Sequence, residues 1–220
     1  AEHCGRGPKG RGLTTISPIA GDYYRRHSRD YFERTVSADA AAILEPVVAQ
    51  VPPPARVLDL GCGSGRDLAW LRARGYTVFG IEAAPELARL AGRHCGCPVI
   101  AADLTTYPLA SFRADLIIAV GSLVHLPPHP LHACLRHIIA GLDLSGGRHL
   151  YLSFKAGNGW EQGEDGRRFY RWRDGSLRAL FRRLGLRVVQ ADTQPSALKT
   201  TTSAIWLAYL LKTPARVRDI

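Results

Sequence analysis

The sequence predicts an α/β fold with a doubly wound, seven-stranded sheet, mostly parallel with an antiparallel last strand, and helices on both faces. Three observations predict it. Apolar strand-like runs alternate with helical segments along most of the chain. A glycine-rich turn, Gly61-Cys62-Gly63-Ser64-Gly65, follows the first of these runs. The chain closes on two strand-like runs with no helix between them, so the final strand is expected to pair antiparallel.

The strands are predicted from short apolar runs bounded by turn residues. Residues 56–60 form an apolar run suited to a sheet that is covered on both faces, and residues 114–120 form a strong fourth run. The seven predicted strands are 56–60, 77–81, 99–102, 114–120, 148–154, 187–191 and 203–211.

The helices are predicted where apolar residues recur at helical spacing. Pro85 suits an early helical position, and Gly75 suits the end of the preceding helix. The predicted helices are 22–35, 38–50, 66–74, 85–93, 130–141 and one that begins at Asp174 or Ser176. Residues 155–168 between the fifth strand and the last helix are polar and glycine-rich, which predicts a functional loop.

A chain of 220 residues with 46% hydrophobic residues is long enough for one domain with a real core. No apolar run reaches membrane-spanning length, and residues 1–11 lack the apolar core of a signal peptide, so the cytoplasm is the expected location. Because the chain begins with Ala and contains no Met, we expect residues 1–21 to be a flexible tail outside the fold.

The formal net charge is +10, and most of the basic residues are Arg. Such a balance is found in proteins that bind nucleic acid or acidic substrates, and also in proteins whose helices carry arginines on solvated faces. We favour the solvated faces, because composition alone is a weak signal.

The five cysteines are odd in number and irregular in spacing, which argues against a disulfide framework. The segment His94-Cys95-Gly96-Cys97 has the residue types of half a zinc site, but no second pair accompanies it. We therefore predict no metal site and interpret these cysteines as the end of a helix and the start of a strand.

Residues 57–67 carry the strongest functional signal. The glycines are spaced G-x-G-x-G, with Asp59 two residues before the first of them, whereas the dinucleotide-binding fingerprint is G-x-G-x-x-G. Such a turn lets backbone N–H groups approach a ligand at a helix N-terminus. The carboxylate suits a cationic ligand, such as an aminoacyl group with its ammonium, better than a pyrophosphate.

This segment resembles the glycine-rich loop of class I S-adenosylmethionine-dependent methyltransferases, and the resemblance covers roughly residues 23–212. The chain is most similar to the small bacterial single-domain members of the ubiquinone-biosynthesis and tellurite-resistance type. The resemblance implies a Rossmann-like domain over 22–220 with an N-terminal helical lid at 22–50. It also implies S-adenosyl-L-methionine as cofactor and S-adenosyl-L-homocysteine as product.

In this family the cofactor lies at the carboxyl ends of the strands. The resemblance implies that Asp59 orients the turn and the ligand's ammonium and that Asp103 reaches the adenine amino group. A carboxylate at Glu82 can accept both ribose hydroxyls. Each acid also has a structural interpretation, as an acceptor for turn N–H groups or a helix cap. The other implied cofactor contacts are Tyr23, Tyr31, Arg34, Gly61, Cys62, Gly63, Gly65, Arg66, Asp67, Ala83, Leu104, Val120, Gly121 and Ser122.

His125 is the candidate catalytic residue, as a general base that faces the acceptor. The alternative is a histidine that only shapes the pocket, which the resemblance favours, because relatives with different acceptors keep a similar residue. Acceptor specificity is implied at residues 155–173, with Lys155, Trp160 and Tyr170 as further substrate-binding candidates. The alternating aromatic and basic residues at 170–173 suit a flat anionic acceptor, a stacked base or an edge strand.

The sequence therefore predicts an enzyme that transfers a methyl group to an N, O or S atom of a small molecule by in-line displacement, as a monomer or homodimer. An RNA or protein methyltransferase that uses the arginine-rich surface is one alternative. The segment Gly121-Ser122-Leu123-Val124 stands where amino-directed nucleic-acid enzymes carry an Asn-Pro-Pro-Tyr type motif, which argues against methylation of a nucleic-acid base. A non-catalytic cofactor-binding module is another, and the glycine spacing argues against a nucleotide-dependent reductase.

Overall fold

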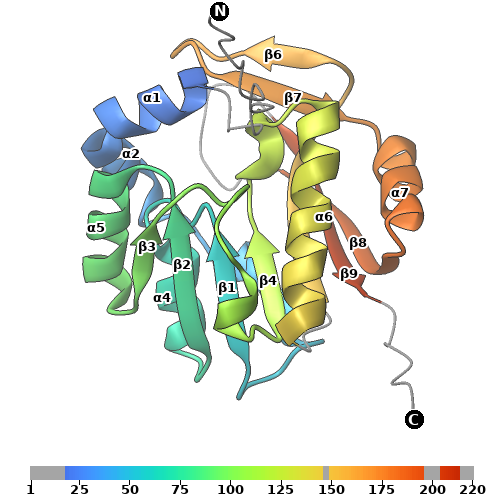
Figure 1. Ribbon diagram of the computed structural model, residues 1–220. Helices are drawn as coiled ribbons and strands as arrows, with labels where there is room; N and C mark the ends of the chain where they lie inside the picture. Colours follow the sequence, from blue (N-terminus) through green and yellow to red (C-terminus); the bar gives the residue numbers. More distant parts are fainter. Residues whose placement is uncertain (1–17, 146–148, 196–203, 214–220) are drawn as a thin grey trace, which may run out of the picture.

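The computed structural model describes residues 18–145, 149–195 and 204–213, and a mixed β-sheet runs through its centre (Figure 1). Five parallel strands lie in the order β3-β2-β1-β4-β5. The strands in chain order are β1 Arg56–Leu60, β2 Thr77–Glu82, β3 Val99–Ala101, β4 Leu116–Ala119, β5 His149–Ala156, β6 Trp160–Gln162, β7 Arg168–Trp172, β8 Arg187–Pro195 and β9 Ile205–Lys212.

The C-terminal strands close the sheet in the antiparallel direction. β9 pairs antiparallel with β5, from His149 opposite Lys212 to Lys155 opposite Trp206, and β8 pairs antiparallel with β9. The predicted fold class and its antiparallel ending are confirmed. The reason is the one read from the sequence, since two consecutive strands without a crossover helix can only run in opposite directions.

The strand count is the first correction: the described residues contain nine strands, not seven. The two additional strands, β6 and β7, form an antiparallel hairpin where residues 155–173 were expected to be a loop. The glycines that suggested a loop lie outside the two strands: Gly157 and Gly159 precede β6, and Gly163 and Gly166 are in the turn, where the Gly163 N–H donates to the Arg167 carbonyl at 2.8 Å. Trp160, Phe169 and Tyr170 supply the aromatic side chains that favour strands.

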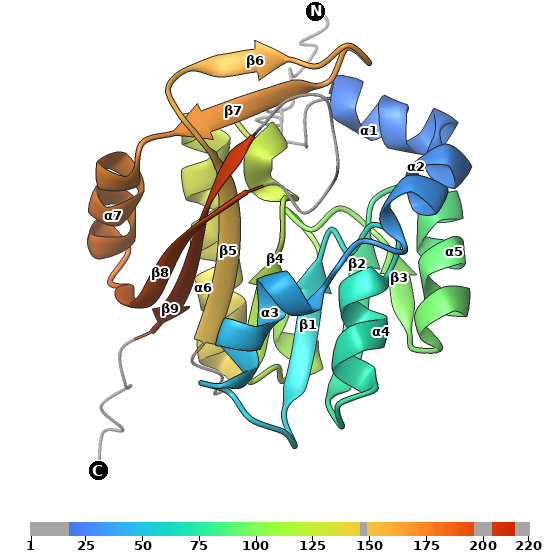
Figure 2. The ribbon, with the colours of Figure 1, turned by 180° about the vertical axis from the view of Figure 1, so that it is seen from behind.

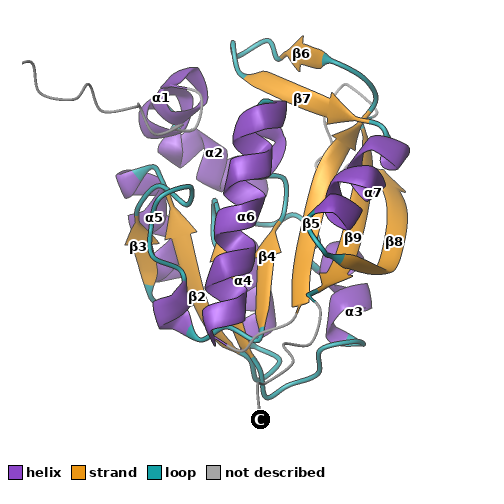
Figure 3. Cartoon of the chain, turned by 45° about the vertical axis from the view of Figure 1, so that its right-hand side comes forward, coloured by secondary structure: helices purple, strands orange, loops and turns teal. Residues whose placement is uncertain are grey.

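Helices cover both faces of the sheet. α3 and α4 lie on one face, seen in front of the sheet in Figure 2, and α6 and α7 lie on the other (Figures 1 and 3). Each face has its own buried apolar cluster, with Leu44 and Leu71 in one and Leu135 and Phe181 in the other. The helices are α1 Pro18–Arg26, α2 Ser28–Thr35, α3 Ala41–Val48, α4 Arg66–Arg72, α5 Pro85–Cys95, α6 Pro128–Ser145 and α7 Asp174–Arg183, with 3₁₀ turns at Ala110–Phe112 and Leu123–His125.

The N-terminal helical segment is the second correction, because the single helix expected over 22–35 is two helices, α1 and α2, that meet at His27. We use the name lid for α1 and α2 together. The buried Ser28 hydroxyl donates to the Tyr24 carbonyl at 2.5 Å, and such back-bonding competes with the regular helical ladder. α1 begins at Pro18, inside the stretch expected to be a tail. Residues 1–17 of that expected tail lie outside the described residues.

α1, α2 and the β6–β7 hairpin lie together above the carboxyl ends of the parallel strands (Figure 1). The lid helices come from the start of the chain and the hairpin from its last third, yet both cover the end of the sheet where the glycine-rich turn lies. The fold thus gathers the predicted functional segments at one edge of the sheet, as expected for an open α/β sheet.

Candidate functional site

The glycine turn after β1 has a backbone that requires glycine. Gly61, Gly63 and Gly65 have φ values of 73°, 56° and 75°, in the left-handed region. A Cβ on Gly65 would meet the Ala91 carbonyl oxygen of α5 at 2.9 Å. The N–H groups of Gly61 and Cys62 both donate to the Ile81 carbonyl of β2, at 2.8 and 3.1 Å. The turn is therefore held close to its neighbours on both sides.

Two carboxylates and one guanidinium lie beside this turn. Asp59 is 2% exposed, and burial, followed by the nearby charge of Asp67, raises its pKa well above the usual value. The Arg66 guanidinium binds Asp67 in a bidentate manner, at 2.7 and 2.9 Å. The charge of Arg66 lowers the pKa of Asp59, but less than burial raises it, so a further cationic group in the adjoining space would favour the ionised carboxylate.

Glu82, at the end of β2, stabilises the glycine turn through hydrogen bonds. Its carboxylate accepts hydrogen bonds from the N–H groups of Gly63 and Ala84, both at 3.0 Å. Burial raises the pKa of Glu82, and these backbone hydrogen bonds oppose that shift. The same carboxylate therefore has a structural role in this conformation.

The loops after β3 and β4 lie against the turn. The Asp103 carboxylate accepts hydrogen bonds from the Thr105 N–H at 2.8 Å and the Thr105 hydroxyl at 2.7 Å, which stabilises the loop after β3. A Cβ on Gly61 would meet Ser122 at 2.5 Å and Leu104 at 3.7 Å. The Ser122 hydroxyl is buried and has no hydrogen-bond partner within the part of the chain that the structure describes.

A chain of hydrogen bonds joins the lid to the hairpin. Arg167 Nη1 donates to Tyr24 Oη at 2.6 Å, and Tyr24 Oη lies 3.0 Å from His125 Nε2. His125 Nδ1 lies 2.8 Å from the Arg168 carbonyl, which only accepts, so Nδ1 carries the proton and Nε2 accepts from the tyrosine. Burial lowers the pKa of His125 to about 4, so the ring is neutral, as this arrangement requires.

Aromatic rings surround the Arg167 guanidinium. Its carbon lies 4.2 Å from the Tyr23 ring centroid, 5.1 Å from that of Tyr24 and 5.0 Å from that of Phe169. Asp165 accepts from the same guanidinium, with 2.6 Å between Nη2 and the carboxylate. Arg167 therefore contacts α1 through the tyrosines and its own hairpin through Asp165 and Phe169, in a place where its side chain is largely buried.

A cavity of about 830 Å³ lies between the glycine turn, the lid and the hairpin. Its turn end is formed by the Asp59–Asp67 segment together with α2 and the start of α3. Its hairpin end is formed by the residues that follow β4 and by residues of β5, β7, β8 and β9. The predicted residues that line the cavity are Tyr31, Arg34, Asp59, Gly61, Cys62, Gly63, Arg66, Asp67, Val120, Gly121 and Lys155.

Other predicted residues lie around the cavity without lining it. Some of them support the turn or the adjoining loops, as described above for Glu82, Asp103 and His125. These residues are Tyr23, Gly65, Glu82, Ala83, Asp103, Leu104, Ser122 and His125. His125 has both ring nitrogens within hydrogen-bond distance of protein groups, which is the arrangement of the pocket-shaping alternative.

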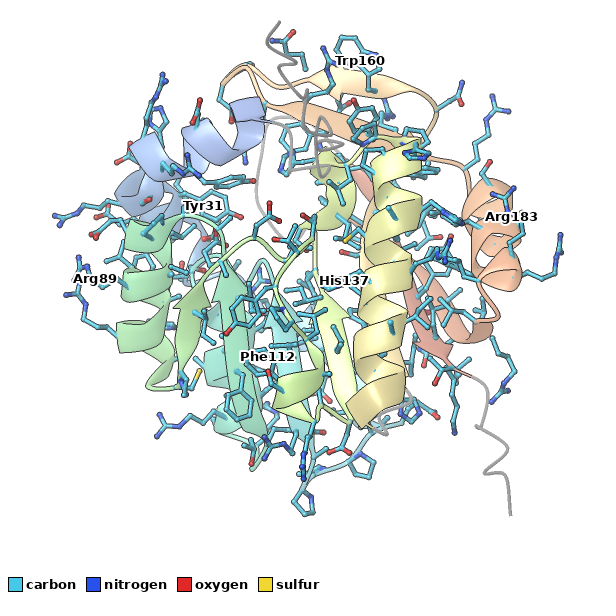
Figure 4. All side chains as sticks on the ribbon, in the orientation of Figure 1. Tyr31, Arg89, Phe112, His137, Trp160 and Arg183 are labelled. Atoms are coloured by element: carbon cyan, nitrogen blue, oxygen red, sulfur yellow. The ribbon has the colours of Figure 1, made fainter. Side chains whose placement is uncertain are left out.

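Trp160 and Tyr170 lie on the opposite face of the hairpin, where they line a second cavity of about 360 Å³. Trp160 is 51% exposed and stands at the top of the molecule in Figure 4, whereas Tyr31 points inward from the lid. Successive residues of a strand face opposite sides, so Phe169 faces the first cavity and Tyr170 the second. These two candidates are therefore separated from the other predicted site residues.

Several cavity residues were not singled out from the sequence. Phe169, Arg167 and Trp206 line the hairpin end, and Tyr24 lines the cavity beside the lid. The alternation of residues 167–172 is a signal for Phe169, once the segment is taken as a strand. Nothing local marks Trp206, whose ring lies over Gly121 so that a Cβ there would meet it at 3.3 Å.

Other classes of site are not found. The described residues contain no group of three or more His, Cys, Asp or Glu side chains that could hold a metal ion. None of the helices in the described ranges is long and apolar enough to cross a membrane. Arg89 on α5 and Arg183 on α7 point outward in Figure 4, which agrees with the interpretation of solvated arginine faces.

Two family models match the chain. The model of a methyltransferase domain matches residues 57–146, and the model of the tellurite resistance protein TehB matches residues 23–88. An uncharacterized methyltransferase of Bacillus subtilis, YrrT, is 31% identical over 101 residues. That match spans 45% of this chain and 44% of YrrT, so it represents less than half of the relative's length.

Solved structures share the fold over most of the chain. Magnesium protoporphyrin IX methyltransferase from Synechocystis, solved with bound SAM, has a TM-score of 0.70 at 17% identity and covers 93% of this chain and 100% of its own. A 1,6-didemethyltoxoflavin-N1-methyltransferase from Burkholderia thailandensis has a TM-score of 0.70 at 21% identity and 94% coverage of both chains. The family models, the strand order and the glycine turn together are similar to those of class I S-adenosylmethionine-dependent methyltransferases, and the solved neighbours share the fold.

Proposed function

We propose that this protein binds S-adenosyl-L-methionine and transfers its methyl group to an N, O or S atom of a small molecule. The observation that carries the proposal is Asp59, a buried carboxylate of raised pKa that lines the cavity at the head of a glycine turn. The aminoacyl ammonium and the sulfonium of the cofactor are both cationic, and a cation in this cavity would favour the ionised form of Asp59.

Further residues of the turn end fit the rest of the cofactor. Arg34 lines the cavity from the lid and supplies a guanidinium for the aminoacyl carboxylate. Gly61 and Gly63 keep the turn free of side chains, so that a ligand can approach its backbone. Glu82 is assigned to the ribose hydroxyls, which requires its carboxylate to exchange the hydrogen bond it now accepts from Gly63. The bound cofactor supplies an activated methyl group.

The hairpin end fits a small acceptor. The whole cavity, about 830 Å³, falls in the size range of small-molecule sites. Lys155 and Arg167 present cationic groups there, while Phe169 and Trp206 present aromatic rings. The two solved neighbours named above act on small molecules according to their descriptions, a magnesium protoporphyrin and a didemethyltoxoflavin. An acceptor with a flat, electron-rich or anionic group suits these walls.

The proposed mechanism depends on positioning. The lid and the hairpin cover the carboxyl ends of the strands, which would keep water away from the reacting atoms and hold the acceptor in line with the methyl carbon. His125 acts here as a positioning residue, because its two nitrogens bind Tyr24 and the Arg168 carbonyl. A cytoplasmic location belongs to the same proposal.

Calorimetric titration with S-adenosyl-L-homocysteine tests the cofactor site. The intact chain is expected to bind with micromolar affinity, roughly −8 kcal/mol. Asp59→Asn keeps the shape of the side chain but removes its charge, and affinity should fall about 100-fold, equivalent to about 2.7 kcal/mol. The matched control is Asp22→Asn, an exposed acid of α1 whose only described ion pair is with Arg25, and its affinity should be unchanged.

Two outcomes would contradict the proposal. If Asp59→Asn bound as tightly as the intact chain, Asp59 would not contact the cationic part of the cofactor. If the intact chain bound no S-adenosyl-L-homocysteine but did bind a nicotinamide dinucleotide, the methyltransferase assignment would fail. Transfer of a labelled methyl group to a panel of small aromatic acids and amines then separates an enzyme from a non-catalytic binding module.

A further inference from the structure

Cys95 and Cys97 form a close pair of thiols outside the cavity. Cys95 is the last residue of α5, and Gly96 follows it with a φ of 63°, which turns the chain back on itself. The two Sγ atoms lie 2.8 Å apart. A disulfide bond requires about 2.05 Å, so closure needs the sulfur atoms to approach by only about 0.8 Å.

The surroundings of the pair favour a thiolate. The hydrogen bond from Cys97 is the main cause that lowers the pKa of Cys95 to about 7, and the nearby Arg72 guanidinium acts in the same direction. The pKa of Cys97 is raised in turn, because the two sulfur atoms share one proton. Arg72 is fixed in place, since its Nη1 donates to the Cys95 carbonyl at 2.9 Å.

The other described cysteines have a different environment. Cys62 and Cys134 are buried, and burial raises the pKa of both, that of Cys134 to about 12. Cys97 is only half-buried, whereas Cys95 is 2% exposed. A reagent from solution therefore meets Cys97 first, with Cys95 directly behind it.

We propose that Cys95 and Cys97 are a thiol–disulfide exchange site for low-molecular-weight disulfides such as glutathione disulfide. The proton that the two sulfur atoms share first passes from Cys97 to Cys95. The half-buried Cys97 thiolate then attacks one sulfur of glutathione disulfide, which forms a mixed disulfide and releases one glutathione thiolate. The Cys95 sulfur then attacks Cys97, the Cys95–Cys97 bond forms, and the second glutathione leaves. The Cys95 proton passes to a released glutathione, so two cysteines are oxidised and one glutathione disulfide becomes two glutathiones.

The site lies on the helix that supports both the turn and the lid. Ala91, one turn before Cys95, backs Gly65 of the glycine turn. His94 packs edge-on against Phe32 of α2, with 5.9 Å between the ring centroids. Exchange at Cys95 and Cys97 therefore occurs next to the contact between α5 and the lid, and it does not depend on the identity of the methyl acceptor.

Thiol mapping of the intact protein tests this proposal. The protein is equilibrated in buffers of increasing glutathione disulfide to glutathione ratio, quenched with acid, alkylated with N-ethylmaleimide and analysed by mass, whole and as peptides. Cys95 and Cys97 should lose alkylation together, with no glutathione retained. Cys134→Ser, a matched control on α6, should lose the same two alkylation sites.

The single variants give opposite results if the order of attack is correct. Cys95→Ser should stop at one glutathione held on Cys97, because the resolving sulfur is missing, while Cys97→Ser should take up none on the buried Cys95. Circular dichroism shows whether each variant is folded. Persistent alkylation of both cysteines at a large excess of glutathione disulfide, or glutathione retained on the intact chain without closure, would overturn the proposal.

Discussion

The floor and the roof of the cavity are built in different ways. The floor consists of the glycine turn and the adjoining strand ends. The turn is a run of consecutive residues whose backbone conformation and close contacts require glycine. The roof is α1, α2 and the β6–β7 hairpin, held by side chains of which Tyr24 and Arg167 are 143 residues apart. The floor therefore has little freedom to change, whereas the roof depends on a few side-chain contacts between segments that are distant in the chain.

Gly65→Ala tests the floor and should have the largest effect. A Cβ at this left-handed residue collides with a backbone carbonyl that cannot rotate away, so we expect a loss of about 3 kcal/mol in the free energy of unfolding. Urea denaturation measures it. Gly175→Ala is the matched control, because this helical glycine has nothing within 4 Å, and it should gain up to about 1 kcal/mol. Equal stability of the two variants would show that the floor is not constrained.

Arg167→Gln tests the roof, and its effect should be smaller and directed at the ligand. The variant loses the hydrogen bond to Tyr24 and the ring contacts, so the lid is held less firmly. Affinity for S-adenosyl-L-homocysteine should fall about tenfold, equivalent to about 1.4 kcal/mol. Arg178→Gln on α7, an exposed arginine paired with Asp174, serves as control and should bind normally. A variant that melts earlier but binds normally would separate the roof from ligand binding.

His125→Gln tests the roof through the pH dependence of the free energy of unfolding. Since burial lowers the pKa of His125 to about 4, below its ordinary 6.5, its contribution to stability is full above pH 6.5 and is lost as the pH falls through that window. The contribution lost by pH 4 is about 3 kcal/mol. Between pH 7 and pH 4 the intact chain should therefore lose more stability than the variant. If the two proteins lost the same stability between pH 7 and pH 4, His125 would already carry a proton in the folded protein.

Trp160→Ala should have the smallest effect. The ring is half exposed beside the second cavity and stacks with Arg168, at 4.1 Å from the guanidinium carbon to the ring centroid. Binding of S-adenosyl-L-homocysteine should stay within about twofold, since the residue lies on the other face of the hairpin. A larger loss would mean that the two faces of the hairpin act together, and that the floor–roof division is too simple.

The floor could be predicted from the sequence because its signals are local. Asp59 and the three glycines are adjacent in the chain, and the strand–turn–helix context is visible in the same eleven residues, 57–67. The fold class follows from the alternation of strands and helices along the chain. The buried strand β1 was found because Val57, Leu58 and Leu60 give it the apolar character of a strand covered on both faces.

The roof could not be predicted in the same way. A polar segment with four glycines has the composition of a loop. The contacts of the hairpin are distant in sequence, since Phe169 packs against His125 and Arg167 binds Tyr24 of the lid, and no local pattern connects these residues. Trp160 and Tyr170 were chosen for their type, but the alternation of a strand points Phe169 to the cavity instead. The pairing of Tyr24 with Arg167 depends entirely on the tertiary structure.

The distance along the chain between Tyr24 and Arg167 has a consequence for synthesis. At the usual rates of translation, roughly 5–20 residues per second, Arg167 is made on the order of 10 s after Tyr24. During that interval the aromatic residues of the lid lack the guanidinium and the hairpin that cover them in the finished molecule. The strands and turn of the floor can associate while the ribosome is still at work, but a closed ligand cavity exists only after the last third of the protein has emerged.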